Sequence, residues 1–210
     1  MSDRPRLLAL EVRAPAAAWR AAGFAVDDDG RCRTGTTDLL LAGGEGGFGG
    51  WTVAGAIPAD DGLDGVPTAV APAVAAPDAE PAPAVHPNTV AAIDHVVLAT
   101  PDTARTFATL EAAGFDLRRV RDASAELRQG FFLFDDLALE VVGPPEPAPG
   151  TAGDPARLWG ITFVAGDLDV AAATPNVGAP RAAVQPGRRI AVVDRAAGLG
   201  VRVALMSPRA

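Results

Sequence analysis

The chain has 210 residues, a formal charge of −8 at pH 7 and an isoelectric point near 4.7, so it lacks the basic surface that a nucleic-acid-binding protein presents. Its single cysteine, Cys32, excludes an intramolecular disulfide and a multi-cysteine zinc site. Neither a signal peptide nor an apolar run as long as a membrane helix is visible. We therefore expect a cytoplasmic protein with no membrane or nucleic-acid partner.

The N-terminal segment begins with the strand-like run Leu7–Val12, continues as a short helix from Pro15 and reaches the sequence Ala-Ala-Gly-Phe at 21–24. The same four residues stand at 112–115, after a helix expected from Pro101. Two helix formers, a glycine that can adopt the left-handed cap and an aromatic residue predict a helix end followed by a strand. The two segments therefore look like repeats of one unit.

Proline-rich stretches divide the chain and set the limits of these units. Such a unit of about 50 residues buries too little surface to be stable alone, so we expect units to pair. The predicted parts are a degenerate N-terminal module at 5–57, a Pro/Ala-rich linker at 58–89, a module at 90–143, a linker at 144–156 and a second module at 157–207 that pairs with 90–143.

Two ionisable residues interrupt apolar strands in the 90–143 segment. His95 lies in the run Ile93–Ala99, and Glu140 lies in the run Leu137–Gly143. Strand alternation places each of them on one face with the apolar residues two positions away. They are candidates for metal binding or for general base chemistry. The alternative is a structural hydrogen bond between them or to the backbone.

These residues resemble the vicinal oxygen chelate superfamily of glyoxalase-like and bleomycin-resistance-like proteins. The resemblance implies an α+β fold in which repeated βαβββ modules form a cupped mixed sheet around a small-molecule cleft. The matching residues are Ile93–Leu98 with Pro101 and Asp102, Leu139–Gly143, Leu158–Val164 with Asp167–Asp169, and His86-Pro87-Asn88, which is similar to an uncharacterised glyoxalase-like branch.

In that superfamily the metal ligands come from the first and last strands of the paired modules. The matching positions here are His95 and Glu140, which suit Zn, Mn, Fe or Ni. The corresponding positions hold Gly160 and Ala204 in the last module, and about Ala9 and Leu40 in the N-terminal one.

Two protein ligands remain, although a tight divalent site usually has three or more. A bound metal would need a further ligand from Gln129, Gln185, His86 or another chain.

Several residues are candidates for substrate binding. Arg119 and Arg121 alternate onto one face of a strand and could hold an anionic group, unless they belong to a solvated sheet edge. Gln129, Phe132 and Trp159 could line the cleft, and core packing is the alternative for the two aromatic residues.

Three classes of function follow from the resemblance. As an enzyme, the protein is expected to be a metal-dependent lyase, isomerase or dioxygenase acting on a small oxygenated molecule, with His95 and Glu140 as catalytic residues and metal ligands. As a binding protein, it sequesters an antibiotic-like or aromatic molecule without a metal. The third class is a purely structural interaction domain. An odd number of modules favours a homodimer, because an unpaired sheet face would otherwise remain exposed.

Overall fold

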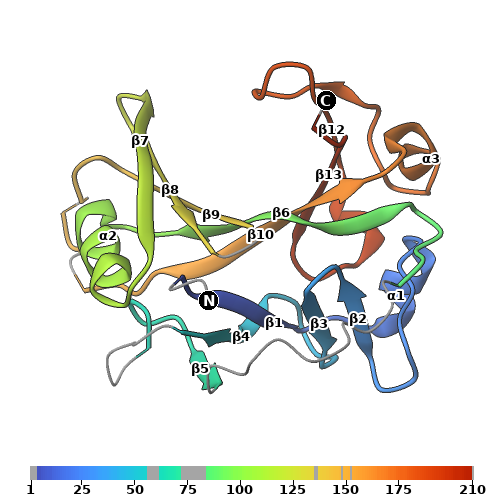
Figure 1. Ribbon diagram of the computed structural model, residues 1–210, viewed down its shortest axis with the longest axis horizontal. Coiled ribbons are helices and arrows are strands. Elements are labelled where there is room, and N and C mark those ends of the chain that lie inside the picture. Colours follow the sequence, from blue (N-terminus) through green and yellow to red (C-terminus); the bar gives the residue numbers. More distant parts are fainter. Residues whose placement is uncertain are drawn as a thin grey trace. The chain divides into compact units, whose positions relative to one another are not determined.

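The computed structural model describes residues 4–55, 62–71, 84–134, 137–147, 149–151 and 153–209 (Figure 1). Their elements form two compact units. Unit 1 takes its described residues from 1–8, 50–78 and 95–159, and unit 2 takes them from 9–49, 79–94 and 160–210. Much of the predicted linker, at 58–61 and 72–83, lies outside the described residues.

The 90–143 segment has the βαβββ order that the sequence predicts. Strand β6 pairs in parallel with β9, and β7, β8 and β9 follow one another as antiparallel neighbours. The elements are β6 (Val90–Ala99), α2 (Thr103–Ala112), β7 (Asp116–Ser124), β8 (Leu127–Leu133) and β9 (Ala138–Gly143).

Helix α2 covers one face of β7, β8 and β9 (Figure 1). It begins at Thr103 rather than at the expected Pro101, because Asp102 caps it: the Asp102 side chain accepts a hydrogen bond from the backbone N–H of Arg105. On its buried side Phe107 meets Phe132 of β8 edge to face, with ring centroids 5.5 Å apart. The opposite face of these strands therefore carries the residues that alternate with Phe132.

The last segment repeats the βαβββ order. Strand β10 pairs in parallel with β13, β12 pairs antiparallel to β13, and Asp167 caps α3. The elements are β10 (Arg157–Ala165), α3 (Leu168–Ala172), β11 (Arg181–Ala182), β12 (Arg189–Val192), the short 3-10 helix η1 (Arg195–Ala197) and β13 (Arg202–Met206). The fold is thus α+β with mixed sheets, as the sequence predicts.

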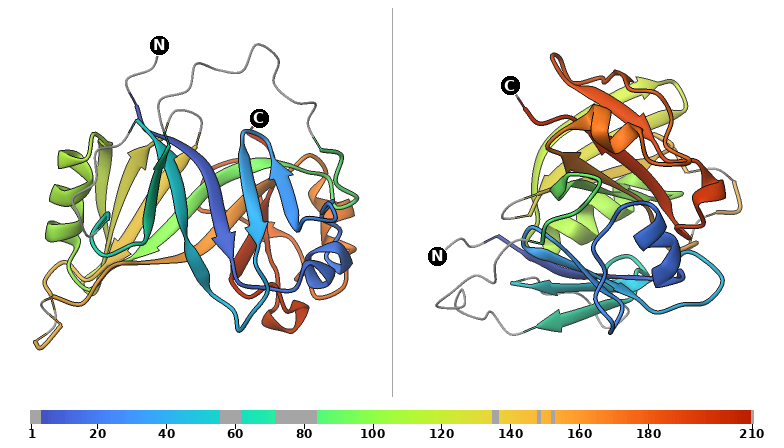
Figure 2. Two further views of the ribbon diagram at one scale, coloured as in Figure 1. Left: turned by 90° about the horizontal axis from the view of Figure 1, so that it is seen from below. Right: turned by 90° about the vertical axis from the view of Figure 1, so that its right-hand side faces the viewer.

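The N-terminal segment has the βαβββ order expected at 5–57, from β1 to β4, but its strand pairing differs from that of the 90–143 segment. The parallel partner of β1 on the hairpin side is β3 rather than the last strand, and β2 and β3 form the antiparallel hairpin seen in Figure 2. Strand β4 pairs in parallel with β5, which lies inside the range expected to be a linker. The elements are β1 (Arg6–Val12), α1 (Ala16–Ala21), β2 (Arg31–Thr34), β3 (Thr37–Leu41), β4 (Phe48–Ala54) and β5 (Thr68–Ala71).

The strand orders of the two sheets explain this difference. The five-stranded order is β2-β3-β1-β4-β5, and the eight-stranded order is β11-β12-β13-β10-β6-β9-β8-β7. The first order matches the stretch β8-β9-β6-β10-β13 of the second, with a parallel pair on each side of the two central strands. Strands β4 and β5 therefore take the places in the five-stranded order that β10 and β13 have in the eight-stranded order.

No helix within the described ranges is long and apolar enough to cross a membrane.

Candidate functional site

His95 and Glu140 lie side by side on neighbouring strands of unit 1. The parallel register pairs His95 with Ala138 and Val97 with Glu140, which places both ionisable side chains on the face away from α2. The Nε2 atom of His95 is 3.5 Å from Oε2 of Glu140, and the two side chains are 13% and 15% exposed. The pair is therefore mostly buried yet accessible to solvent.

Two more side chains continue this pair across the sheet. Gln129 Nε2 donates a hydrogen bond of 2.5 Å to Glu140 Oε1, and Arg121 Nε donates one of 3.0 Å to Gln129 Oε1, which also accepts from Arg121 Nη2. Arg121, Gln129, Glu140 and His95 thus form a row across β7, β8, β9 and β6, which we call the polar row.

The polar row fixes the orientation of the Gln129 amide. Its oxygen faces the Arg121 guanidinium, and its NH2 group faces the Glu140 carboxylate. The reversed amide would set donor against donor and acceptor against acceptor. Glu140 Oε1 is therefore occupied, and Oε2 is the oxygen that faces His95.

Of the other predicted substrate-binding residues, one shares this face and one does not. Arg119 is exposed and lies opposite Phe131, which lies opposite Glu140, so Arg119 is on the polar-row face. Phe132 lies opposite Leu139 on the other face and is fully buried against α2. The structure therefore brings Phe131, and not Phe132, to the polar row. Two adjacent phenylalanines look alike in the sequence, and only the strand register distinguishes them.

Trp159, the last predicted substrate-binding residue, lies on β10 in unit 1 with 42% of its surface exposed. It remains a candidate for apolar contact with a ligand.

The strand registers show which residues take the places of His95 and Glu140 in the other modules. Strands β10 and β13 pair Gly160 with Arg202 and Thr162 with Ala204, so Gly160 and Ala204 are the equivalents in the last module. Strands β1 and β3 pair Ala9 with Asp38 and Glu11 with Leu40, so Ala9 and Leu40 are the equivalents in the N-terminal sheet. None of these four side chains can bind a metal.

The donor set for a metal is accordingly small. Across the residues that the structure describes, no three His, Cys, Asp or Glu side chains come together as a metal site. His95 and Glu140 are two ligands, fewer than the three or more of most divalent sites. Of the predicted auxiliary ligands, Gln129 reaches Glu140, whereas Gln185 lies in unit 2 beside the turn before β12.

His86 has a different role from the one considered in the sequence. It is buried in unit 2, where its Nδ1 accepts the backbone N–H of Ala25 at 2.8 Å and its Nε2 lies 2.8 Å from the carbonyl oxygen of Arg33. This arrangement requires a neutral ring with the proton on Nε2. Burial lowers the pKa of His86, and the hydrogen bond to the Arg33 carbonyl opposes the shift more weakly.

The lowered pKa of His86 predicts acid-dependent stability. Above the unfolded-state pKa of about 6.5 the ring is neutral in both the folded and the unfolded state, so the protein loses no stability through protonation of His86. As the pH falls from there towards the lower folded-state pKa, the unfolded chain binds the proton more readily and stability decreases. Denaturant unfolding between pH 7 and 5 should show this loss, and His86→Gln should flatten it.

The chain has only two histidines, so His95→Gln is the matched control. If the slope disappears in His95→Gln and persists in His86→Gln, His95 rather than His86 carries the acid dependence.

Cys32 lies on β2 between Arg31 and Arg33 and is fully buried. Burial raises the pKa of its thiol to about 12, with smaller contributions from Asp38 and Asp27. Only the thiolate is nucleophilic, so Cys32 is a structural residue and not a reactive one.

No protein-family model and no curated protein sequence matches this chain. Solved structures that resemble it include methylmalonyl-CoA epimerase from Mycobacterium tuberculosis, with 16% identity, a TM-score of 0.45 and coverage of 58% of this chain and 91% of the other. A variant of the Streptomyces coelicolor epimerase in complex with 2-nitronate-propionyl-CoA has 21% identity, a TM-score of 0.45 and coverage of 58% and 96%. A hypothetical protein from Bacillus halodurans has 13% identity, a TM-score of 0.44 and coverage of 56% and 94%.

At these identities and TM-scores the likeness carries no activity, substrate or cofactor to this chain. The fold itself has two segments in βαβββ order, each with its first strand parallel to its last. This is the architecture that the resemblance to the vicinal oxygen chelate superfamily implies.

Proposed function

We propose that the protein is an isomerase that binds a small oxygenated molecule at the polar row and moves a proton next to a carbonyl group. The observation that supports this most is the His95–Glu140 pair, in which Glu140 Oε1 is held by Gln129 and Oε2 faces His95 at 3.5 Å. A positioned carboxylate with one oxygen available is suited to general base chemistry.

In the proposed step, Glu140 Oε2 removes a proton from the carbon beside the substrate carbonyl. The electron pair of the broken C–H bond forms a carbon–carbon double bond, and the carbonyl electron pair moves onto oxygen to give an enolate. His95 donates a hydrogen bond to the enolate oxygen. Transfer of this proton from Glu140 to the enolate oxygen gives the enol isomer, whereas its return to the original carbon regenerates the substrate. Neither step needs an oxidant or a reductant.

The arginines on this face favour a substrate that also carries an anionic group. Arg121 uses Nε and Nη2 to hold Gln129, and its Nη1 has no hydrogen-bond partner within the described part of the chain. Arg119 lies two residues earlier on the same strand and is exposed. A guanidinium with unused donors can bind a carboxylate or phosphate.

Deuterium incorporation from D2O tests the proposal with a small panel of carbonyl compounds, so the natural substrate need not be identified first. Candidate probes are dihydroxyacetone phosphate, phenylpyruvate and methylmalonyl-CoA, the last being the ligand in one structural neighbour's complex. We expect the protein to accelerate loss of the proton signal beside the carbonyl of at least one probe. Exchange at the buffer rate for every probe that binds would contradict the proposal.

A metal-dependent lyase, isomerase or dioxygenase using Zn, Mn, Fe or Ni stays a prediction. His95 and Glu140 would hold the metal, but the described residues offer no third side chain of the usual ligand types. We therefore derive no step that depends on a metal.

A second candidate function is sequestration of an antibiotic-like or aromatic molecule without reaction. Gly160 and Ala204, which replace the ionisable pair in the last module, favour it because they leave that module without reactive side chains at these positions. In the exchange experiment this function predicts line broadening of a bound probe with no deuterium incorporation. The homodimer also stays a prediction, which light scattering would check.

A further inference from the structure

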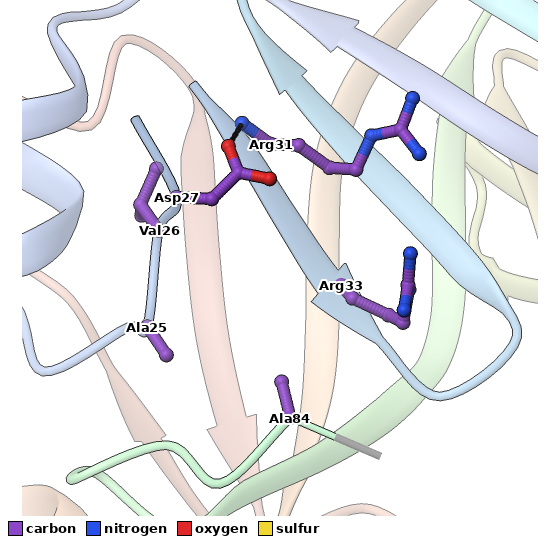
Figure 3. Close-up of a pocket in the computed structure, with 6 residues that line it drawn as sticks. All are labelled: Ala25, Val26, Asp27, Arg31, Arg33 and Ala84. Carbon is purple, nitrogen blue, oxygen red and sulfur yellow. Dashed lines mark hydrogen bonds between the residues drawn. The ribbon is translucent and has the colours of Figure 1, made fainter. Parts of the chain in front are cut away.

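Unit 2 contains a cavity of about 390 Å³ that shares no residue with the polar row. Figure 3 shows its lining, which is Ala25, Val26, Asp27, Arg31, Arg33 and Ala84. The volume lies within the range of small-molecule sites, near its lower end. The cavity therefore has room for a small ligand.

Two arginines of β2 supply the positive side of this cavity. Arg31 and Arg33 are two residues apart on the strand, so their side chains share one face, while Cys32 between them points into the core. Both reach the same carboxylate on β3, with 3.3 Å from Arg31 Nη1 and 3.4 Å from Arg33 Nε to oxygens of Asp38. The two guanidinium groups therefore share the Asp38 carboxylate.

The arginines keep donors for a ligand. Charge-assisted hydrogen bonds are typically about 2.7–2.9 Å long, so the contacts to Asp38 are loose. Arg33 uses only Nε for Asp38, and Nη1 and Nη2 have no hydrogen-bond partner in the described ranges. The side chains of Arg31 and Arg33 are 48% and 32% exposed, so a ligand can reach them.

The acidic residue in the lining, Asp27, is oriented by its own turn, because its Oδ1 accepts the backbone N–H groups of Asp29 and Arg31. These donors are neutral, so Asp27 keeps its negative charge beside the two arginines. The Arg20 guanidinium donates to the carbonyl oxygens of Val26 and Asp27 and adds a further positive charge beside the turn.

The rest of the lining is apolar and is held in place by His86. Ala25, Val26 and Ala84 contribute short apolar side chains. His86 joins Ala25 to Arg33 through its two ring nitrogens, at 2.8 Å each, so two walls of the cavity are fixed by one buried side chain. The cavity is thus a defined shape with two cationic groups on one side and methyl groups on the other.

We propose that this cavity binds a small carboxylate with a short apolar body, its carboxylate contacting Arg31 and Arg33 and its body lying against Ala25, Val26 and Ala84. Asp38 is the internal competitor for the two guanidinium groups. This site is additional to the polar row and does not depend on the isomerase proposal.

The test is a titration of the full chain with hexanoate at low salt, in which NMR chemical shifts of the protein are recorded at each hexanoate concentration. We expect saturable shifts at Ala25, Val26 and Ala84 and at the Arg31 and Arg33 side chains. Two control ligands each lack one half of the contacts: hexanol has the apolar chain without the charge, and inorganic phosphate has the charge without the apolar chain. Both should bind at least roughly tenfold more weakly than hexanoate.

Three variants complete the test. Arg31→Gln with Arg33→Gln should weaken hexanoate binding by roughly tenfold or more, because the charge-assisted contacts are lost. Asp38→Asn should strengthen it severalfold, because the competing carboxylate is removed. The matched control is Arg118→Gln with Arg128→Gln, which removes two arginines of unit 1 that likewise pair with Asp116 and Asp122.

The results that overturn the proposal are specific. The proposal fails if the wild-type protein shows no saturable shifts with hexanoate, or if it binds phosphate as tightly as hexanoate. It also fails if the control pair of substitutions weakens hexanoate binding as much as Arg31→Gln with Arg33→Gln does, or if Asp38→Asn binds hexanoate more weakly than the wild type. If Arg31→Gln with Arg33→Gln disturbs the fold, the Asp38→Asn result alone decides, because that variant keeps both arginines.

Discussion

Replacing Glu140 by glutamine should lower the rate of proton exchange by roughly 10²–10⁴-fold, the range typical of a general base. The amide has nearly the shape of the carboxylate and can still present an oxygen to Gln129 Nε2, whose present contact with Glu140 Oε1 is 2.5 Å. It cannot accept a proton from carbon. The side chain facing His95 is therefore kept in place while its basicity is removed.

The measurement is the deuterium incorporation rate, together with the dissociation constant of the same probe. The dissociation constant of the probe should change by only a few-fold, so the decrease in exchange activity should appear as a lower kcat. The matched control is Glu111→Gln, an exposed residue of α2, the helix on the other face of these strands. An exchange rate unchanged in Glu140→Gln would remove Glu140 from the reaction and leave the sequestering function as the better account.

The second large effect is expected for stability, in the variant Asp94→Ala. Asp94 Oδ1 lies 2.6 Å from Arg188 Nη1, and the two side chains are only 8% and 4% exposed. Arg188 Nε also donates to the carbonyl oxygen of Ser207 at 2.8 Å, whereas its buried Nη2 has no partner within the described residues. Removing Asp94 leaves a buried charge without its carboxylate, which typically costs about 3–5 kcal/mol.

Urea unfolding measures the stability that Asp94→Ala loses, and two further variants serve as comparisons. Asp169→Ala breaks the exposed pair between Asp169 and Arg189, whose side chains are 68% and 49% exposed, and should change the free energy of unfolding little because solvent screens this pair. Arg188→Met combined with Asp94→Ala should recover part of the stability, because the unpaired charge is removed as well. A loss in Asp94→Ala no larger than in Asp169→Ala would show that the buried pair contributes little.

Local sequence signals predicted the segment at 90–143 well. The Ala-Ala-Gly-Phe sequence at 112–115 predicted the end of α2: Gly114 follows the helix with φ at +95°, and Phe115 directly precedes β7. The helix start was predicted less closely, because α2 begins at Thr103 after the Asp102 cap rather than at Pro101. These features act over a few residues, so they are readable without the fold. The α+β class and the βαβββ order of both C-terminal segments were implied by the resemblance to the vicinal oxygen chelate superfamily, and these local signals agree with them.

The N-terminal sheet could not be read in the same way. Which strand lies beside β1 is decided by long-range pairing, and the short run at Thr68–Ala71 gives no local sign that it will pair with β4. Its surroundings are rich in proline and alanine, which favoured a linker. A strand of four residues gains its stability from its partner rather than from its own propensity.

The candidate site is only partly predictable from the sequence. Strand alternation alone places His95 and Glu140 each on a defined face of its strand, and the sequence also offers Gln129 as a candidate for metal or substrate binding. The row from Arg121 to Glu140 depends on the hairpin register, which pairs Arg121 with Gln129. That register includes shifts between Leu117 and Arg119 and between Asp122 and Ser124, which no sequence period reveals.

The most direct test of the account is the deuterium exchange rate of wild-type protein before and after chelation, measured beside Glu140→Gln. We expect exchange that survives chelation and is lost in Glu140→Gln, because the side chains of the polar row move the proton. Exchange that is abolished by chelation and restored by Zn, Mn, Fe or Ni would contradict it. His95 and Glu140 would then be metal ligands, completed by a group outside the described set.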